Sequence, residues 1–119
     1  MNPRAEELKA RTKRFALDVI RFVSGLPRIP AADVMGRQLL KAGTSVAANY
    51  RSACRSRSHA EFTARIGVVL EESDESEFWL ELFDESKLPA VKVPPLLLQE
   101  SRELRAIFSA SSLTARGRR

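Results

Sequence analysis

The six prolines of this 119-residue chain mark where its helices can begin and end, because a proline breaks a helix anywhere but in its first turn. They fall at the start of the chain and in two short segments, at positions 3, 27, 30, 89, 94 and 95. Asn2 and Pro3 form a pair typical of a helix N-cap and first helical position. A further boundary lies at Ser58, where Glu61 completes the spacing of a capping box and is expected to reach back to the Ser58 N–H. The sequence therefore predicts four helices.

Apolar residues recur at helical spacings of three and four within each of the four segments. The first segment ends near Gly25, and its core stripe comprises Leu8, Phe15, Ala16, Val19, Ile20, Phe22 and Val23, with Arg11, Arg14 and Arg21 on the other side. Helices of about 18 to 28 residues with connections of roughly 4 to 8 residues pack as antiparallel neighbours. We therefore predict an all-α fold, an antiparallel up-down-up-down four-helix bundle. A stack of helical repeats is the alternative, but the segments share no sequence period.

Length and composition fit one domain, which we expect to span residues 1–115, followed by a basic C-terminal tail at residues 116–119. Cys54 is the single cysteine, which is typical of a reducing compartment. No apolar run approaches the ~20 residues that span a bilayer, and the start of the chain does not resemble a signal segment. We therefore predict a cytoplasmic protein without a membrane partner.

Charge is sorted along the chain into blocks of opposite sign. Residues 1–60 carry a net charge of +8, residues 61–86 carry −8 and residues 87–119 carry +5. A basic helix pair followed by an acidic helix attracts opposite charge, either within the fold, across subunits or on a polyanion. The choice among these three partners is the main functional question for this sequence.

The chemistry-bearing residues do not combine into a catalytic or metal site. A carboxylate-bridged metal centre in a bundle needs Glu-x-x-His pairs, but His59 is the only histidine, and with Cys54 it cannot supply four zinc ligands. Cys54 could be a nucleophile activated by nearby arginines, but a packed cysteine at a helix end is the simpler interpretation. No glycine-rich phosphate loop follows a strand. We therefore expect no enzyme activity, no metal and no cofactor.

A second apolar strip is predicted on the third segment, opposite its core side. At 100° per residue, Phe78 and Leu82 lie on the acidic side of the helix, and Trp79 lies between the two faces. Four acids rim the strip, namely Glu71, Glu75, Glu81 and Glu85. An apolar strip with a charged rim is typical of a subunit contact, so we predict a homo-oligomer whose interface includes Phe78, Trp79, Leu82, Glu71 and Glu75. The alternative is that two exposed apolar residues are ordinary surface residues.

The second segment carries a row of basic residues opposite its core, spread over ~27 Å of helix. We predict that nucleic acid binds to this row and to the loop after it, through Arg37, Lys41, Arg51, Arg55 and Arg57. Tyr50 is the nearest aromatic residue, so binding is expected to follow the phosphate backbone and to tolerate any base sequence. The alternative is a self-assembling structural or protein-interaction scaffold without nucleic-acid binding, in which the row meets the acidic helix of a neighbouring copy.

Several motifs resemble the bacterial family called four helix bundle proteins. They are Gln-Leu-Leu-Lys-Ala at 38–42, Ser-Val-Ala-Ala-Asn at 45–49, Arg-Ser at 57–58, Glu-Phe at 61–62, Glu-Glu-Ser-Asp-Glu-Ser at 71–76 and Trp-Leu-Glu-Leu at 79–82. The family includes proteins encoded in intervening sequences of ribosomal RNA genes and accessory proteins of diversity-generating retroelements. The resemblance extends over residues 8–110.

This resemblance implies a pentamer of antiparallel bundles that binds nucleic acid and a partner such as a reverse transcriptase, and it supplies no catalytic residue. Two departures from the family pattern stand out. Tyr-Arg-Ser-Ala at 50–53 replaces the Ile-Ala-Glu-Gly of many relatives, and the first helix lacks their aromatic-rich opening. The junction after the second helix is therefore more basic in this chain. Together, residues and resemblance predict a non-catalytic oligomeric accessory protein that binds nucleic acid.

Overall fold

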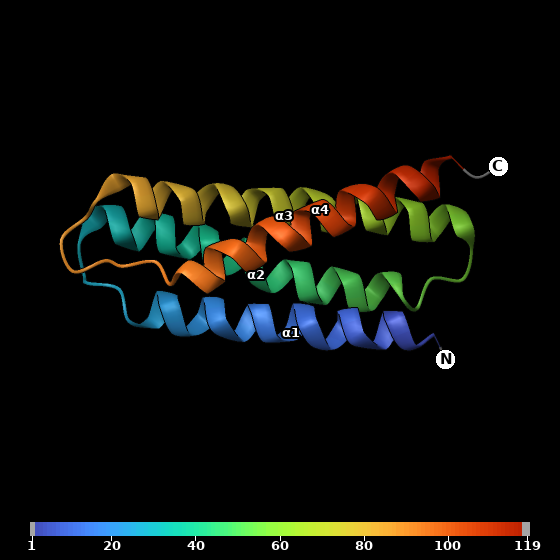
Figure 1. Ribbon diagram of the computed structural model, residues 1–119, viewed down its shortest axis with the longest axis horizontal. Coiled ribbons are helices and arrows are strands. Elements are labelled where there is room, and N and C mark those ends of the chain that lie inside the picture. Colours follow the sequence, from blue (N-terminus) through green and yellow to red (C-terminus); the bar gives the residue numbers. More distant parts are fainter. Residues whose placement is uncertain (1, 118–119) are drawn as a thin grey trace.

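Three of the four helices begin at a proline, as predicted for Pro3, while the second helix begins at Pro30, slightly before the start around Ala31 to Asp33 that the sequence suggests. The computed structural model describes residues 2–117, which form α1 (Pro3–Ser24), α2 (Pro30–Ala53), α3 (His59–Ser86) and α4 (Pro95–Arg116). A proline suits the first helical position because its missing N–H has no partner there in any case. Successive helices run antiparallel (Figure 1), so the predicted all-α, up-down-up-down four-helix bundle is confirmed. No helix within the described residues is long and apolar enough to cross a membrane.

The predicted helix caps form, with one difference at α3. The Asn2 side chain accepts a hydrogen bond from the Arg4 N–H at 2.9 Å. Ser58 Oγ likewise accepts from the Glu61 N–H at 3.1 Å, as a capping box requires. The prediction that Glu61 also accepts a hydrogen bond from the Ser58 N–H is wrong. Glu61 instead accepts from the Arg57 N–H at 3.4 Å and from Arg65 Nε at 3.2 Å. The two neighbouring arginines draw the carboxylate away from the cap.

The helix ends follow the predicted boundaries closely. Helix α3 ends where Lys87 adopts a left-handed conformation, with φ at 54°, just before Pro89. Helix α4 continues to Arg116, so the first residue of the expected tail is helical, and the Gly117 N–H donates to the Leu113 carbonyl at 3.1 Å. The rest of that tail, residues 118–119, lies outside the described residues.

The core receives large side chains from all four helices. Its largest fully buried residues are Phe15, Phe83, Phe108, Leu39, Ile66, Leu80, Leu104, Val19, Val46 and Val69. Ile20 does not belong to this core, although its spacing suggests that it should, because 40 % of its surface remains exposed. Its neighbour Val19 already fills the space between α1 and α2 by packing on Gly43. The core stripe of α1 is therefore narrower than predicted.

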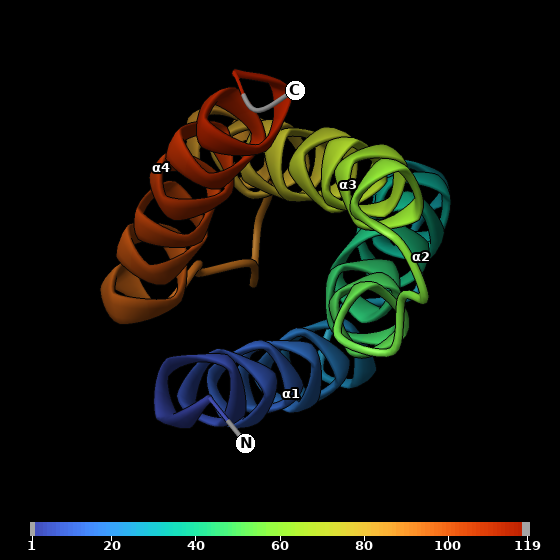
Figure 2. The same ribbon diagram turned by 90° about the vertical axis from the view of Figure 1, so that its right-hand side faces the viewer.

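The seam between α1 and α4 is the least closed of the bundle. In an end-on view, α1 packs on α2, α2 on α3 and α3 on α4, whereas α1 and α4 stand apart (Figure 2). Arg11 of α1 bridges them: its Nε and Nη2 donate to the two carboxylate oxygens of Glu100 at 2.7 Å, and Nη2 also donates to Glu103 at 2.8 Å. The hydrogen bond to Glu100 is the main reason that the pKa of Arg11 is raised. Arg11 thus faces α4, not solvent as its sequence position suggested.

Candidate nucleic-acid interface

Three residues of the predicted basic row, Arg37, Lys41 and Arg51, lie on the outer side of α2, whereas Arg55 lies in the turn just after the helix ends at Ala53. Arg37, Lys41, Arg51 and Arg55 are all exposed, while Leu39 and Val46, among other residues on the opposite side of the helix, are fully buried. Within residues 2–117, none of these four cations lies within ion-pair distance of a carboxylate. The row therefore has no strong internal counter-charge, although Glu72 of α3 lies near enough to Lys41 for that charge to affect the pKa of its carboxyl.

Helix α1 adds two lysines to this row that sequence reasoning missed. A groove of about 500 Å³ between α1 and α2 is lined by Lys9 and Lys13 on one side and by Arg51 and Arg55 on the other. Its remaining lining consists of Glu6 and small residues, namely Ala10, Thr44, Ala47 and Ala48. Lys9 pairs with Glu6 at 2.6 Å, whereas Lys13 has no ionic partner in the described chain. Lys9 and Lys13 are four residues apart and therefore lie on one side of their helix. This spacing was the sequence signal that could have indicated a basic surface on α1.

The middle of the same surface is apolar. Leu17 and Ile20 are 44 % and 40 % exposed, and they continue the row of α1 residues that begins with Ala10 and Lys13. Because Val19 packs on Gly43, the segment of α1 that holds these two residues lies beside the middle of α2. We call this whole surface the basic face, and it comprises Lys9, Lys13, Leu17, Ile20, Arg37, Lys41, Thr44, Ala48, Arg51 and Arg55.

Arg57, the fifth residue of the predicted interface, and Tyr50, the nearest aromatic residue, do not lie in this row. Arg57 lies in the connection after α2, where its side chain is 93 % exposed and its Nε stands 4.0 Å from a Glu61 carboxylate oxygen. It therefore does not extend the helical row. Tyr50 is buried, and its ring centroid lies 5.2 Å from that of Phe108. Burial raises the pKa of the Tyr50 hydroxyl, and the neighbouring Cys54 thiol raises it further. Its ring is not available for stacking on a base.

The outer side of α3 carries the predicted apolar strip. Phe78 is 52 % exposed and Leu82 is 37 % exposed. The Trp79 ring packs edge-on against Phe78, with centroids 5.0 Å apart, and its Nε1 donates to Glu75 at 3.3 Å. Val68, Glu71 and Glu75 continue the row at spacings of three and four, and Glu85 follows it. We call this surface the acidic strip, and it comprises Val68, Glu71, Glu75, Phe78, Leu82 and Glu85.

Some acids of α3 do not belong to this strip. Glu77 and Glu81 pair with Arg105 and Arg102 of α4, at 2.9 and 3.1 Å. Glu81 was predicted to rim the subunit contact, but it faces α4 because its helical position is turned about 100° from that of Leu82. The exposed row that includes Glu71 and Glu75 has no such partner in the described chain.

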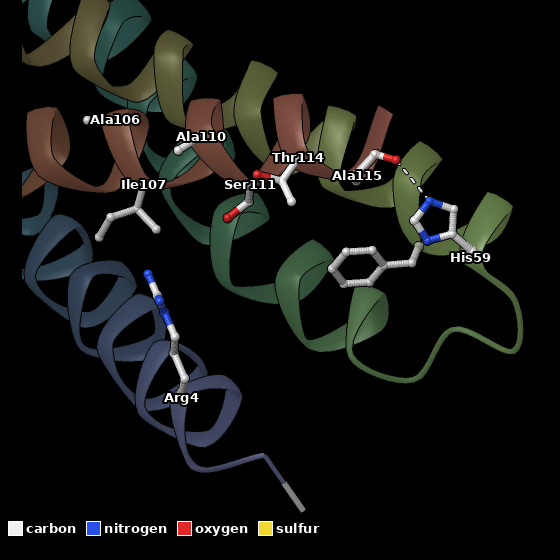
Figure 3. A pocket seen from close by; sticks show the side chains of 9 residues that line it. Arg4, His59, Ala106, Ile107, Ala110, Ser111, Thr114 and Ala115 are labelled. Atoms are coloured by element: carbon white, nitrogen blue, oxygen red, sulfur yellow. Dashed lines mark hydrogen bonds between the residues drawn. The ribbon is translucent and has the colours of Figure 1, made fainter. Parts of the chain in front are cut away.

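The open end of the seam between α1 and α4 contains a cleft of about 630 Å³ (Figure 3). Arg4 points toward it from α1, while Ile107 and Ser111 line it from α4. His59 Nε2 lies 2.8 Å from the Ala115 carbonyl oxygen, so this ring links the start of α3 to the end of α4. Among residues 2–117, no three His, Cys, Asp or Glu side chains are grouped closely enough to hold a metal ion.

One similar solved structure places this fold among known proteins. It is the crystal structure of a protein of unknown function from the S23 ribosomal protein family of Bacteroides thetaiotaomicron. The two chains share 27 % sequence identity, the match covers 87 % of this chain and 96 % of the other, and the TM-score is 0.77. No family model and no curated protein matches the sequence. The chain therefore has the fold of this neighbour, and its resemblance to the intervening-sequence and retroelement proteins stays a prediction.

Proposed function

We propose that this protein is a non-catalytic homo-oligomer that binds the phosphate backbone of nucleic acid through its basic face, as an accessory to a nucleic-acid enzyme. The observation that carries the proposal is the lack of ionic partners for Arg37, Lys41, Arg51 and Arg55 within residues 2–117. The arginines of α4 provide the contrast, since Arg102 and Arg105 pair with acids of α3. A row of cations without internal counter-ions attracts external anions.

Other observations agree with this function. Tyr50 is buried, so the face offers positive charge without a stacking ring, which favours backbone contacts that tolerate any sequence. The similar solved structure carries the name of a ribosomal protein family, which agrees with a nucleic-acid partner. The family resemblance adds a pentameric assembly, a bacterial source and a partner such as a reverse transcriptase to the proposal, and the single Cys54 adds a cytoplasmic location.

The test is a binding titration by fluorescence anisotropy with labelled RNA, single-stranded DNA and duplex DNA at ~50 mM salt. We expect the wild type to bind and a variant with Arg51→Glu and Arg55→Glu to lose most of its affinity. The matched control is Lys92→Glu with Arg116→Glu, which changes the net charge equally at exposed positions outside the basic face. No binding of the wild type to any of the three ligands contradicts the proposal.

A second candidate function is a self-assembling scaffold without nucleic-acid binding. The observation in its favour is the exposure of Phe78 and Leu82 on the acidic strip, because such a patch on one helix is typical of a subunit contact. Replacing both residues by Glu should give smaller species in light scattering. The control replaces Leu96 and Leu113, two exposed leucines of α4, by Glu. A wild type that is monomeric at micromolar concentration rules out this function.

A further inference from the structure

The basic face and the acidic strip have the same layout with opposite charge. On the basic face, Arg37 and Lys41 lie at one end, Arg51 and Arg55 lie at the other, and Leu17 and Ile20 flank the middle. On the acidic strip, the exposed apolar pair of Phe78 and Leu82 likewise lies between two acidic groups. Glu71 and Glu75 precede this pair, and Glu85 follows it. An apolar centre with charged ends is the arrangement of a specific protein contact.

The two surfaces also match in length. At ~1.5 Å per residue, and with the helical rise extended over the two turn residues after α2, the midpoints of the two basic pairs lie ~21 Å apart. The midpoint of Glu71 and Glu75 lies ~18 Å from Glu85 on α3 by the same measure. In each surface an exposed apolar pair falls between the charged groups, while Val68 lies beyond Glu71 at one end of the acidic strip. A straight helix can therefore present its acids to both basic pairs while its apolar pair covers Leu17 and Ile20.

Neither surface finds its partner within one chain. The four cations of the basic row and the acids Glu71, Glu75 and Glu85 form no ion pair in the described residues, whereas Glu77 and Glu81 are paired across the α3 and α4 interface. The two surfaces belong to neighbouring helices whose outer sides point in different directions (Figure 2), so they cannot meet in the same molecule. A second copy of the chain carries the complement of each.

We infer that the acidic strip of one copy docks on the basic face of a second copy, and that nucleic acid competes with this contact. The contact is heterologous, because it joins two different surfaces. A chain of copies has a free strip at one end and a free face at the other, so it either closes into a ring or grows as an open filament. Glu71 and Glu75 oppose the end that holds Lys13, Arg51 and Arg55, since the larger acidic group faces the larger basic group. Glu85 then faces Arg37 and Lys41.

The competition rests on the proposed function, because both ligands use the same cations. A phosphate backbone and the acidic strip both present negative charge, and the side chain of Arg51 or Arg55 can bind only one of them at a time. Nucleic acid therefore binds to copies whose basic face is free, namely dissociated copies and the end copy of an open chain. A closed ring, such as the pentamer that the family resemblance implies, binds it only after one contact opens. Assembly therefore weakens the binding of nucleic acid through this shared surface, and nucleic acid weakens assembly by the same factor.

Charge exchange between copies tests the docking contact. The first variant carries Arg51→Glu and Arg55→Glu, and the second carries Glu71→Lys and Glu75→Lys. Each alone meets like charge at the contact, so we expect its association to weaken by at least roughly tenfold in sedimentation velocity. A mixture of the two restores association between unlike variants, because the reversed face of one meets the reversed strip of the other. The copies must alternate, so the mixture forms open chains or even-numbered rings, and a five-membered ring cannot close. The combined variant, with all four changes in one chain, restores it as well.

Three results overturn the docking contact: a single variant that assembles like the wild type, a mixture that stays dissociated, or a wild type that is already monomeric. Circular dichroism of each variant verifies its fold before the comparison. The mixture uses only the two variants, so this test is independent of nucleic acid and of the proposed function.

The competition has its own readout. The variant Phe78→Glu with Leu82→Glu keeps the whole basic face but cannot dock, so it should bind a labelled DNA duplex several-fold more tightly than the wild type at protein concentrations where the wild type assembles. The control with Leu96→Glu and Leu113→Glu, which adds the same negative charge outside both surfaces, should bind no more tightly than the wild type. Equal affinities for all three proteins overturn the competition, and a failure of every protein to bind overturns the proposed function while leaving the docking contact intact.

Discussion

Val19 of α1 and Gly43 of α2 lie so close that a Cβ atom on residue 43 would come within 2.9 Å of Val19 Cγ2 and 3.2 Å of its Cβ. Val19 is fully buried and its branched side chain has little rotational freedom, so it cannot move aside. Glycine at position 43 therefore sets the distance between α1 and α2. The groove that brings Lys13 beside Arg51 depends on this distance.

The first prediction concerns this contact. Gly43→Ala should lower the free energy of unfolding by about 1 to 3 kcal/mol, because overpacking outweighs the gain in helix propensity of about 1 kcal/mol. Gly67→Ala in α3 is the control, since a Cβ there meets nothing within 4 Å, and it should stabilise the protein by up to ~1 kcal/mol. Urea denaturation followed by circular dichroism measures both. Equal stabilisation by the two substitutions would show that α1 and α2 have room to separate.

The second prediction concerns Arg11, which bridges the open seam to Glu100 and Glu103. Arg11→Met keeps much of the apolar stem but leaves Glu100 partly buried without its partner, so we expect a loss of about 1 to 3 kcal/mol in unfolding free energy. Arg21→Met is the control, because Arg21 pairs with Asp18 at an exposed position and its loss should cost under about 1 kcal/mol. Hydrogen exchange should accelerate along α1 and α4 in the first variant. Equal effects of both substitutions contradict a bridging role for Arg11.

The third prediction is a pH dependence at Glu72. Burial raises the pKa of this carboxyl, Glu75 and Glu71 raise it further, and Lys41 opposes them. The folded state thus binds the proton more tightly than the unfolded state, so ionised Glu72 destabilises the fold at neutral pH. This destabilisation disappears as the pH falls through the raised pKa. Glu72→Gln should therefore raise the urea midpoint at neutral pH but not below about pH 4, where both states are protonated. An equal difference at both pH values contradicts this account.

The helices could be predicted from the sequence because their signals are local. Pro3, Pro30 and Pro95 each act within one turn, and Ser58 caps the residue three positions ahead. The buried stripes follow from periodicity in the same way. The outer position of Phe78 also follows from its angle relative to the core, since a single helix determines it.

The contacts between helices could not be predicted in this way. Arg11 and Glu100 are 89 residues apart, and only the packing of α4 beside α1 brings them together. Lys13 joins Arg51 in the basic face for the same kind of reason, because the contact of α1 with α2 fixes which residues are neighbours. Charge blocks in the sequence indicated attraction between basic and acidic helices, but not which acids the fold itself would neutralise.

The last prediction is the salt dependence of nucleic-acid binding, which reports how many cations of the basic face contact phosphates. If about four contacts form on duplex DNA, the plot of log affinity against log salt should have a slope of about −3.6, from ~0.9 per neutralised phosphate. Arg37→Glu with Lys41→Glu and Arg51→Glu with Arg55→Glu should each reduce the slope to about −1.8, because each pair removes half of the contacts. The control with Lys92→Glu and Arg116→Glu should weaken binding slightly through net charge while keeping the original slope. If all three variants instead lose affinity and slope equally, binding reflects the overall positive charge of the protein rather than contacts made by the basic face.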